Sequence, residues 1–180
     1  MAASADAGAQ LRFSGGSTRL VVNPAVLPAL ASAGVSIAAV APATAEAARW
    51  DSQATIAARF PIRGGHADPT TLTGIIDHRG GLTFSKGAHL LTVGRFRISI
   101  HRRAYLSGEV GFNSRMRVPL LRLDLSHARV GASRRWVTVA GVRAYLTRTA
   151  AGALNATLGT SVFAPGLRLG VARVHARLAG

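Results

Sequence analysis

The chain of 180 residues contains no cysteine, which excludes disulfides, thiolate metal sites and a cysteine nucleophile. The absence does not assign a compartment, since many exported bacterial proteins also lack cysteine. Aromatic residues make up only 6% of the chain, so its core has to be built from Val, Leu and Ile around a few Phe and Trp anchors. An apolar share of 48% is enough for such a core, and the length suits one domain.

Acidic residues are also scarce. Seven Asp and Glu face 22 basic residues, which gives a net charge of +15, and every basic side chain except Lys86 is an arginine. One explanation is an arginine-rich composition that also aids solubility. The other is a polyanionic partner, because guanidinium groups pair well with phosphate and carboxylate. Composition alone does not choose between nucleic acid, an anionic cell-wall polymer and an acidic membrane surface.

Long membrane-spanning runs are lacking as well. Residues 20–45 carry no charge, but Asn23, Pro24, Pro28 and Gly34 interrupt this run, so we predict a short helix followed by a strand and no transmembrane span. Residues 1–14 have the small, polar composition of a disordered tail, and residues 15–180 are expected to form a single β-rich domain. No signal peptide is present in this chain, and we expect an extracellular or cell-envelope location after removal of one.

Alternation of apolar and polar residues dominates after residue 55 and predicts strands. Turn residues separate these strands every 8–14 residues, a spacing typical of a mainly β fold. We therefore predict an antiparallel β-sandwich or partly open barrel with two short covering helices, at 23–34 and, capped by Thr149, at 149–159. The predicted strands cover 56–62, 74–79, 82–85, 90–100, 104–112, 118–130, 136–146 and 167–178.

The most chemical-looking stretch is GIIDHRGGLTFSKGAHLL, residues 74–91. In a strand, Asp77 and His78 would point to opposite faces and could not act as a pair. The Gly80-Gly81 pair matches no phosphate-binding loop and indicates a tight hairpin turn. The six histidines show no metal-ligand spacing, and the carboxylates occur singly, so we expect neither a metal site nor catalytic activity.

Basic residues recur with strand spacing and are more informative. They form the rows Arg95/Arg97/Ser99/His101, Arg122/Asp124/Ser126 and Arg173/His175/Arg177. Such rows predict an Arg/His ladder on one face of a sheet, although any antiparallel sheet can present a polar face to water. The aromatic residues fall mostly on apolar registers, so sequence-specific nucleic-acid recognition is not expected.

Four motifs carry a resemblance to a known family: FPIRGG (60–65), DPTTLTG (68–74), IIDHRGGLTFS (75–85) and AYLSGEV (104–110). In this order they resemble the haem-transport-associated (HtaA-type) domains of actinobacterial surface proteins and related uncharacterised exported proteins. The resemblance implies a surface location and haem as a cofactor. The family binds haem through an N-terminal tyrosine. Residues 1–60 hold none, so the ligand would have to be Tyr105 or Tyr145. The family's histidine after the glycine turn is replaced here, and His89 lies two residues further on.

Together these observations predict a non-catalytic extracellular or cell-envelope binding or structural module, with a basic sheet face for an anionic partner. Two alternatives stay open: a carrier of haem or another small apolar ligand, and a self-assembling surface or filament subunit joined through strand edges as a homo-oligomer. The residues expected to contact a ligand are His89, Tyr105, Arg97, His101, Arg173, His175 and Arg177.

Overall fold

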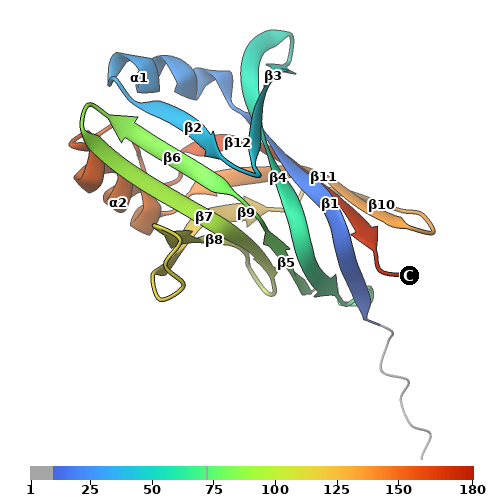
Figure 1. Cartoon of the computed structure of the whole chain (residues 1–180). Coiled ribbons are helices and arrows are strands. Elements are labelled where there is room, and N and C mark those ends of the chain that lie inside the picture. The colour runs from blue at the N-terminus through green and yellow to red at the C-terminus, as the bar shows by residue number, and fades with distance from the viewer. Residues whose placement is uncertain (1–9, 72) are drawn as a thin grey trace, which may run out of the picture.

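The structure is a computed structural model that describes residues 10–71 and 73–180. Most of this chain is strand, as the alternating pattern predicts (Figure 1). The strands are β1 (Leu11–Val22), β2 (Ser36–Val40), β3 (Thr44–Trp50), β4 (Gln53–Ala67), β5 (Gly74–His78), β6 (Gly81–Lys86), β7 (His89–Ile100), β8 (Ala104–Val110), β9 (Arg117–Asp124), β10 (Arg129–Ala132), β11 (Trp136–Leu146) and β12 (Arg168–Leu178).

The strands form a closed antiparallel barrel. Its order is β7-β5-β4-β1-β12-β11-β9-β8, and pairing between β7 and β8 joins the two ends. The mainly β prediction is therefore confirmed. Of the two predicted architectures the barrel is the one formed, and its closure removes the free edges that an open sheet would expose. Outside the barrel, β3 pairs with β4, β10 with β11, and β2 and β6 extend the sheet beyond β7. Among the described residues, β2, β3 and β10 are each paired on one side only.

The Gly80-Gly81 step is not the hairpin turn that the sequence indicates. Strands β5 and β6 do not pair with each other. They lie end to end along β7, with β5 opposite Arg97–Ile100 and β6 opposite His89–Gly94. The real hairpin turn follows Lys86, which pairs with His89. Gly80 has a positive φ of 80°, and a Cβ there would lie 2.5 Å from the backbone nitrogen of Ala43, so this position needs glycine.

Two helical segments cover one end of the barrel (Figure 1). A 3₁₀ turn (Pro24–Val26) runs into α1 (Leu27–Ser32), and the Asn23 side chain accepts the Ala25 N–H. The second helix, α2 (Arg148–Leu158), is capped by Thr147 and not by Thr149. Gly159 ends it in the left-handed conformation. No helix in the described ranges is long and apolar enough to cross a membrane.

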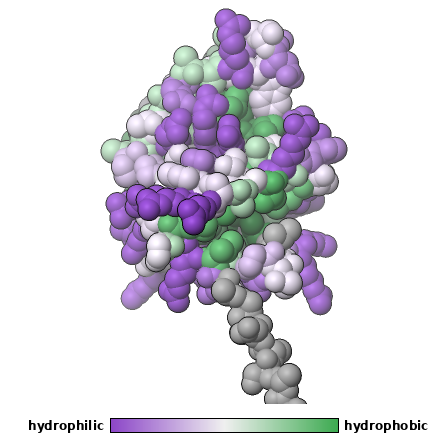
Figure 2. Space-filling view, turned by 90° about the vertical axis from the view of Figure 1, so that its right-hand side faces the viewer, coloured by the Kyte–Doolittle hydropathy of each residue, from purple (hydrophilic) through white to green (hydrophobic). Residues whose placement is uncertain are grey.

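Side chains alternate between the barrel interior and its outer surface. On β12, Ala172, Val174 and Ala176 are buried, and the three residues between and after them are exposed. Leu158 of α2 is fully buried and joins the core to the helical end. Figure 2 shows hydrophilic side chains over much of one side of the molecule, with apolar surface among them. Strand β1 begins at Leu11, so residues 11–14 belong to the barrel and not to a tail, whereas residues 1–9 of the predicted tail lie outside the described residues.

Candidate functional site

Basic side chains from three adjacent strands meet on the outer surface of the barrel. Arg19 of β1 lies directly opposite Arg59 of β4 on one side and Arg173 of β12 on the other. Two positions further along β12 come His175 and then Arg177, both exposed. We call these five residues, Arg59, Arg19, Arg173, His175 and Arg177, the basic wall. Neighbouring strands are about 4.8 Å apart, so the three arginines in one row repel each other.

One carboxylate lies against the basic wall. Glu46 of β3 accepts a hydrogen bond from Arg19 Nε, and its Oε1 lies 3.6 Å from Arg59 Nη2. The hydrogen bond from Arg19, assisted by Arg59, holds the pKa of Glu46 below its usual value. Neither Arg173 nor Arg177 has an acidic partner among the described residues. The wall therefore keeps an excess of positive charge.

An aromatic platform borders the basic wall. The indole of Trp136 on β11 stacks on the His175 ring, with centroids 4.2 Å apart and planes 6° from parallel. Thr138 Oγ1 lies 2.8 Å from His175 Nδ1 and fixes the imidazole in this position. Arg177 Nε donates to Ser14 Oγ at 3.3 Å. These contacts hold two polar groups of the wall at its outer surface. Sequence inspection grouped the β12 residues but missed Arg19, Arg59 and Trp136, which come from distant strands.

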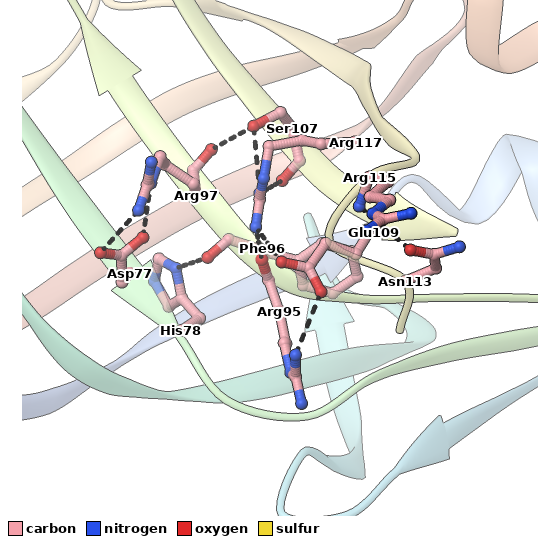
Figure 3. Close-up of polar contacts among 10 residues, drawn as sticks. All are labelled: Asp77, His78, Arg95, Phe96, Arg97, Ser107, Glu109, Asn113, Arg115 and Arg117. Atoms are coloured by element: carbon pink, nitrogen blue, oxygen red, sulfur yellow. Dashed lines mark hydrogen bonds and ion pairs between the residues drawn. The ribbon is translucent and has the colours of Figure 1, made fainter. Parts of the chain in front are cut away.

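Asp77 and His78 are separated as strand alternation predicts (Figure 3). Asp77 faces outward and accepts two hydrogen bonds from Arg97, at 2.7 and 3.3 Å. His78 faces inward and is 3% exposed. Its Nδ1 donates to the Phe96 carbonyl at 3.2 Å, because a carbonyl can only accept, so its Nε2 accepts from the Thr18 hydroxyl at 2.7 Å. Burial lowers the pKa of His78 to about 4.

A second ion-pair network lies beside this pair on β7, β8 and β9 (Figure 3). Glu109 is 6% exposed and lies between two arginines, with Arg117 at 2.8 Å and Arg95 at 3.4 Å. Arg117 also donates to the Arg95 carbonyl at 3.0 Å. Arg95 has a positive φ of 46° where the β7–β8 register shifts, and this irregularity lets it reach Glu109. Arg95 and Arg97 are thus both bound to carboxylates.

The remaining sequence-predicted residues lie apart from one another. His89 is exposed at the β6–β7 turn, and His101 is exposed on the turn between β7 and β8. Tyr105 is half-buried on β8 and lies opposite Arg122 of β9. Arg122 in turn lies over the Tyr145 ring at 4.6 Å. The structure therefore brings together Arg173, His175 and Arg177, and it does not join them to His89, Arg97, His101 or Tyr105. A role in ligand contact stays a prediction for all seven.

An apolar cavity of about 140 Å³ lies where the barrel meets the helices and the β2–β6 extension. All of its lining residues are Ala, Val, Leu, Ile or Phe. They include Phe84 from the extension, Leu91 from β7 and Leu154 from α2. Ile56 and Ala153, also in the lining, are exposed and connect the cavity to solvent.

The cavity lining does not fit haem coordination, because hydrocarbon side chains offer no iron ligand. Both tyrosines are placed elsewhere: Tyr145 packs under Arg122 on the outside of the barrel, and Tyr105 lies opposite the same arginine. Both ring nitrogens of His78 are already hydrogen-bonded. No group of three potential metal ligands occurs within residues 10–71 and 73–180. The cavity can therefore hold an apolar group, but its lining offers no ligand to a metal.

Comparison with solved structures confirms the resemblance at the level of the fold. The crystal structure of the C-terminal domain of HtaA from Corynebacterium glutamicum matches with a TM-score of 0.64 and 17% identity, over 94% of this chain and 99% of that domain. A variant of the same domain, solved as a domain-swapped dimer, matches with a TM-score of 0.55 and 16% identity, over 86% of this chain and 88% of the variant. No protein-family model matches the sequence. No curated protein matches it either.

Proposed function

We propose that this protein is a non-catalytic extracellular or cell-envelope binding module that holds an anionic partner on its basic wall. The observation that carries the proposal is the row Arg59–Arg19–Arg173, in which like charges lie directly opposite each other on adjacent strands. Such pairs are unfavourable within the protein itself, and Glu46 compensates only Arg19 and Arg59 of the row. An anionic partner would compensate them, and the stacked Trp136–His175 pair offers it an adjacent flat surface.

Removing Arg173 and Arg177, which have no acidic partner among the described residues, is expected to weaken binding to a polyanion. We expect R173Q/R177Q to bind heparin about tenfold more weakly than the unmodified protein, equivalent to about 1.4 kcal/mol. Elution from immobilised heparin over a salt gradient, and isothermal titration at fixed salt, measure the change.

Because Arg173 repels Arg19, R173Q alone is expected to raise the free energy of unfolding by about 0.2–1 kcal/mol.

The matched control is R129Q/R134Q, which removes the same charge from exposed positions on and beside β10. This variant is expected to keep most of the heparin affinity. Equal weakening in both double variants would mean that only net charge matters, and the basic wall would then have no special role.

The second candidate function is that of a carrier for a small apolar ligand, favoured by the cavity between the barrel and the helices. A cavity of about 150 Å³ in another protein stays dry and binds benzene, so 140 Å³ of purely apolar space is adequate for a ligand of that size. No coordination to iron is available from the lining, so the ligand would be held by burial of apolar surface alone.

Benzene tests the carrier function. We expect benzene to shift methyl resonances of Leu154 and Leu91 in NMR spectra, and A153W to abolish the shifts by closing the cavity entrance. The control A156W places the same bulk on an exposed position of the same helix outside the lining, and should leave benzene binding intact. Hemin should give no Soret band of a coordinated haem at stoichiometric amounts. Benzene binding that is unaffected by A153W would contradict the assignment.

A further inference from the structure

The turn between β7 and β8 and the adjoining end of β9 surround a cleft of about 410 Å³. The β7–β8 turn lies at the end of the barrel away from the helices (Figure 1). Three of the residues around the cleft, His101, Arg102 and Arg103, form the exposed turn between β7 and β8. The fourth basic residue of the lining is Arg122, near the end of β9. The Tyr145 ring beneath it holds it in place. We call these four residues the cationic rim. The volume falls within the range of about 300–1,000 Å³ that is usual for ligand pockets.

Apart from Asp124, the other residues of the cleft lining are apolar. Ile100, Leu123 and Leu125 line the cleft, and the same three residues line a smaller cavity of about 50 Å³ inside the barrel. The other walls of that inner cavity are apolar apart from Thr18. Charge at the rim and hydrocarbon below it is a combination that suits an amphiphile.

The rim has more positive charge than its acidic neighbours can balance. Asp124 is the one carboxylate in the described lining of the cleft, and it already accepts the Ser126 N–H at 2.9 Å. Within the described part of the chain, none of the three rim arginines forms an ion pair. Three guanidinium groups at one mouth are therefore available to a negatively charged group.

We propose that this mouth binds a single-chain amphiphilic anion, with its carboxylate or phosphate head on the cationic rim and the first carbons of its chain on Ile100, Leu123 and Leu125. The proposal is separate from the basic wall, whose five residues lie on other strands and do not line the cleft. The same head chemistry is found in a free fatty acid or alkyl phosphate and in an anionic lipid of a membrane.

Isothermal titration with dodecanoate and dodecyl phosphate, below their micellar concentrations, tests the proposal. Both should bind, dodecyltrimethylammonium should not, and inorganic phosphate should bind at least about tenfold more weakly than dodecyl phosphate, because it cannot use the apolar floor. R102Q/R103Q should lose about tenfold in affinity for dodecanoate. The control R134Q/R135Q removes the same charge from the exposed β10–β11 turn and should bind dodecanoate normally.

The source of the head group is separated by a vesicle assay. Co-sedimentation with phosphatidylglycerol vesicles that dodecanoate prevents would assign the mouth to a membrane lipid, whereas binding of dodecanoate without vesicle binding would assign it to a free amphiphile. Either result supports the proposal. Absence of dodecanoate binding at millimolar concentration, equal binding of inorganic phosphate and dodecyl phosphate, or equal losses in the two double variants would each overturn it.

Discussion

Replacing Arg117 by methionine is expected to lower the free energy of unfolding by about 3–5 kcal/mol, the cost of leaving a buried charge without its partner. Glu109 is 6% exposed, and Arg117 is its closer partner at 2.8 Å. Arg95 stays within 3.4 Å, but its side chain is 57% exposed and compensates the carboxylate less well. Urea denaturation of the unmodified protein and R117M at neutral pH measures the difference.

The double variant R117M/E109Q distinguishes a buried charge from lost packing. Removing the carboxylate removes the group that was left uncompensated, so the double variant should be more stable than R117M alone. R59M is the matched control, because Arg59 pairs with Glu46 at 3.6 Å on the surface, where both side chains are exposed by more than a third. R59M should lose less than about 1 kcal/mol of unfolding free energy. If R117M and R59M lost equal stability, burial of Glu109 would have no energetic consequence.

Acid is expected to destabilise the protein between about pH 6.5 and pH 4 through His78. Burial lowers the pKa of this side chain from 6.5 to about 4 in the folded state, whereas the unfolded chain keeps the ordinary value. Between these values the unfolded state binds more protons, so stability rises with pH across the window. The contribution is complete above pH 6.5 and lost as pH falls to 4. It amounts to about 3 kcal/mol, since one pKa unit corresponds to about 1.4 kcal/mol.

H78Q tests this assignment, because glutamine can accept from Thr18 and donate to the Phe96 carbonyl without titrating. From pH 7 to pH 4 the unmodified protein should lose about 3 kcal/mol of unfolding free energy relative to H78Q. H101Q alters an exposed histidine on a turn and should follow the pH profile of the unmodified protein. An H78Q profile as steep as that of the unmodified protein would place the acid sensitivity elsewhere.

The sequence predicted well where alternation is local. The row Arg173/His175/Arg177 is exposed, with Val174 and Ala176 buried, because successive side chains on a strand point to opposite faces. The same rule separated Asp77 from His78. It also holds at Arg95, which is exposed between buried Gly94 and Phe96 although a register shift and a positive φ lie there. The hairpin turn predicted from the Gly80-Gly81 pair was wrong, because the chain continues along β7 there instead of folding back.

Two predictions concern binding to other molecules, which neither the residue pattern nor the structure tests. Self-assembly through strand edges stays a prediction, as does contact between a ligand and His89. The resemblance of the motifs at 60–110 to HtaA-type domains is confirmed for the fold by the match to the Corynebacterium glutamicum domain. Haem, which the same resemblance implies, finds no ligand in the apolar cavity, because coordination needs particular side chains and the fold alone does not provide them.

By itself the sequence determined that this protein is a mainly β domain with an arginine-rich surface and no cysteine chemistry, because composition and alternation are properties of neighbouring residues. Only the tertiary structure decided that the sheet closes through β7 and β8, and that Arg19, Arg59 and Arg173 form one row. It also decided that Arg102 and Arg103 share a cleft with Arg122. Strand order and register join residues far apart in the chain, and local periodicity carries no information about which strands pair.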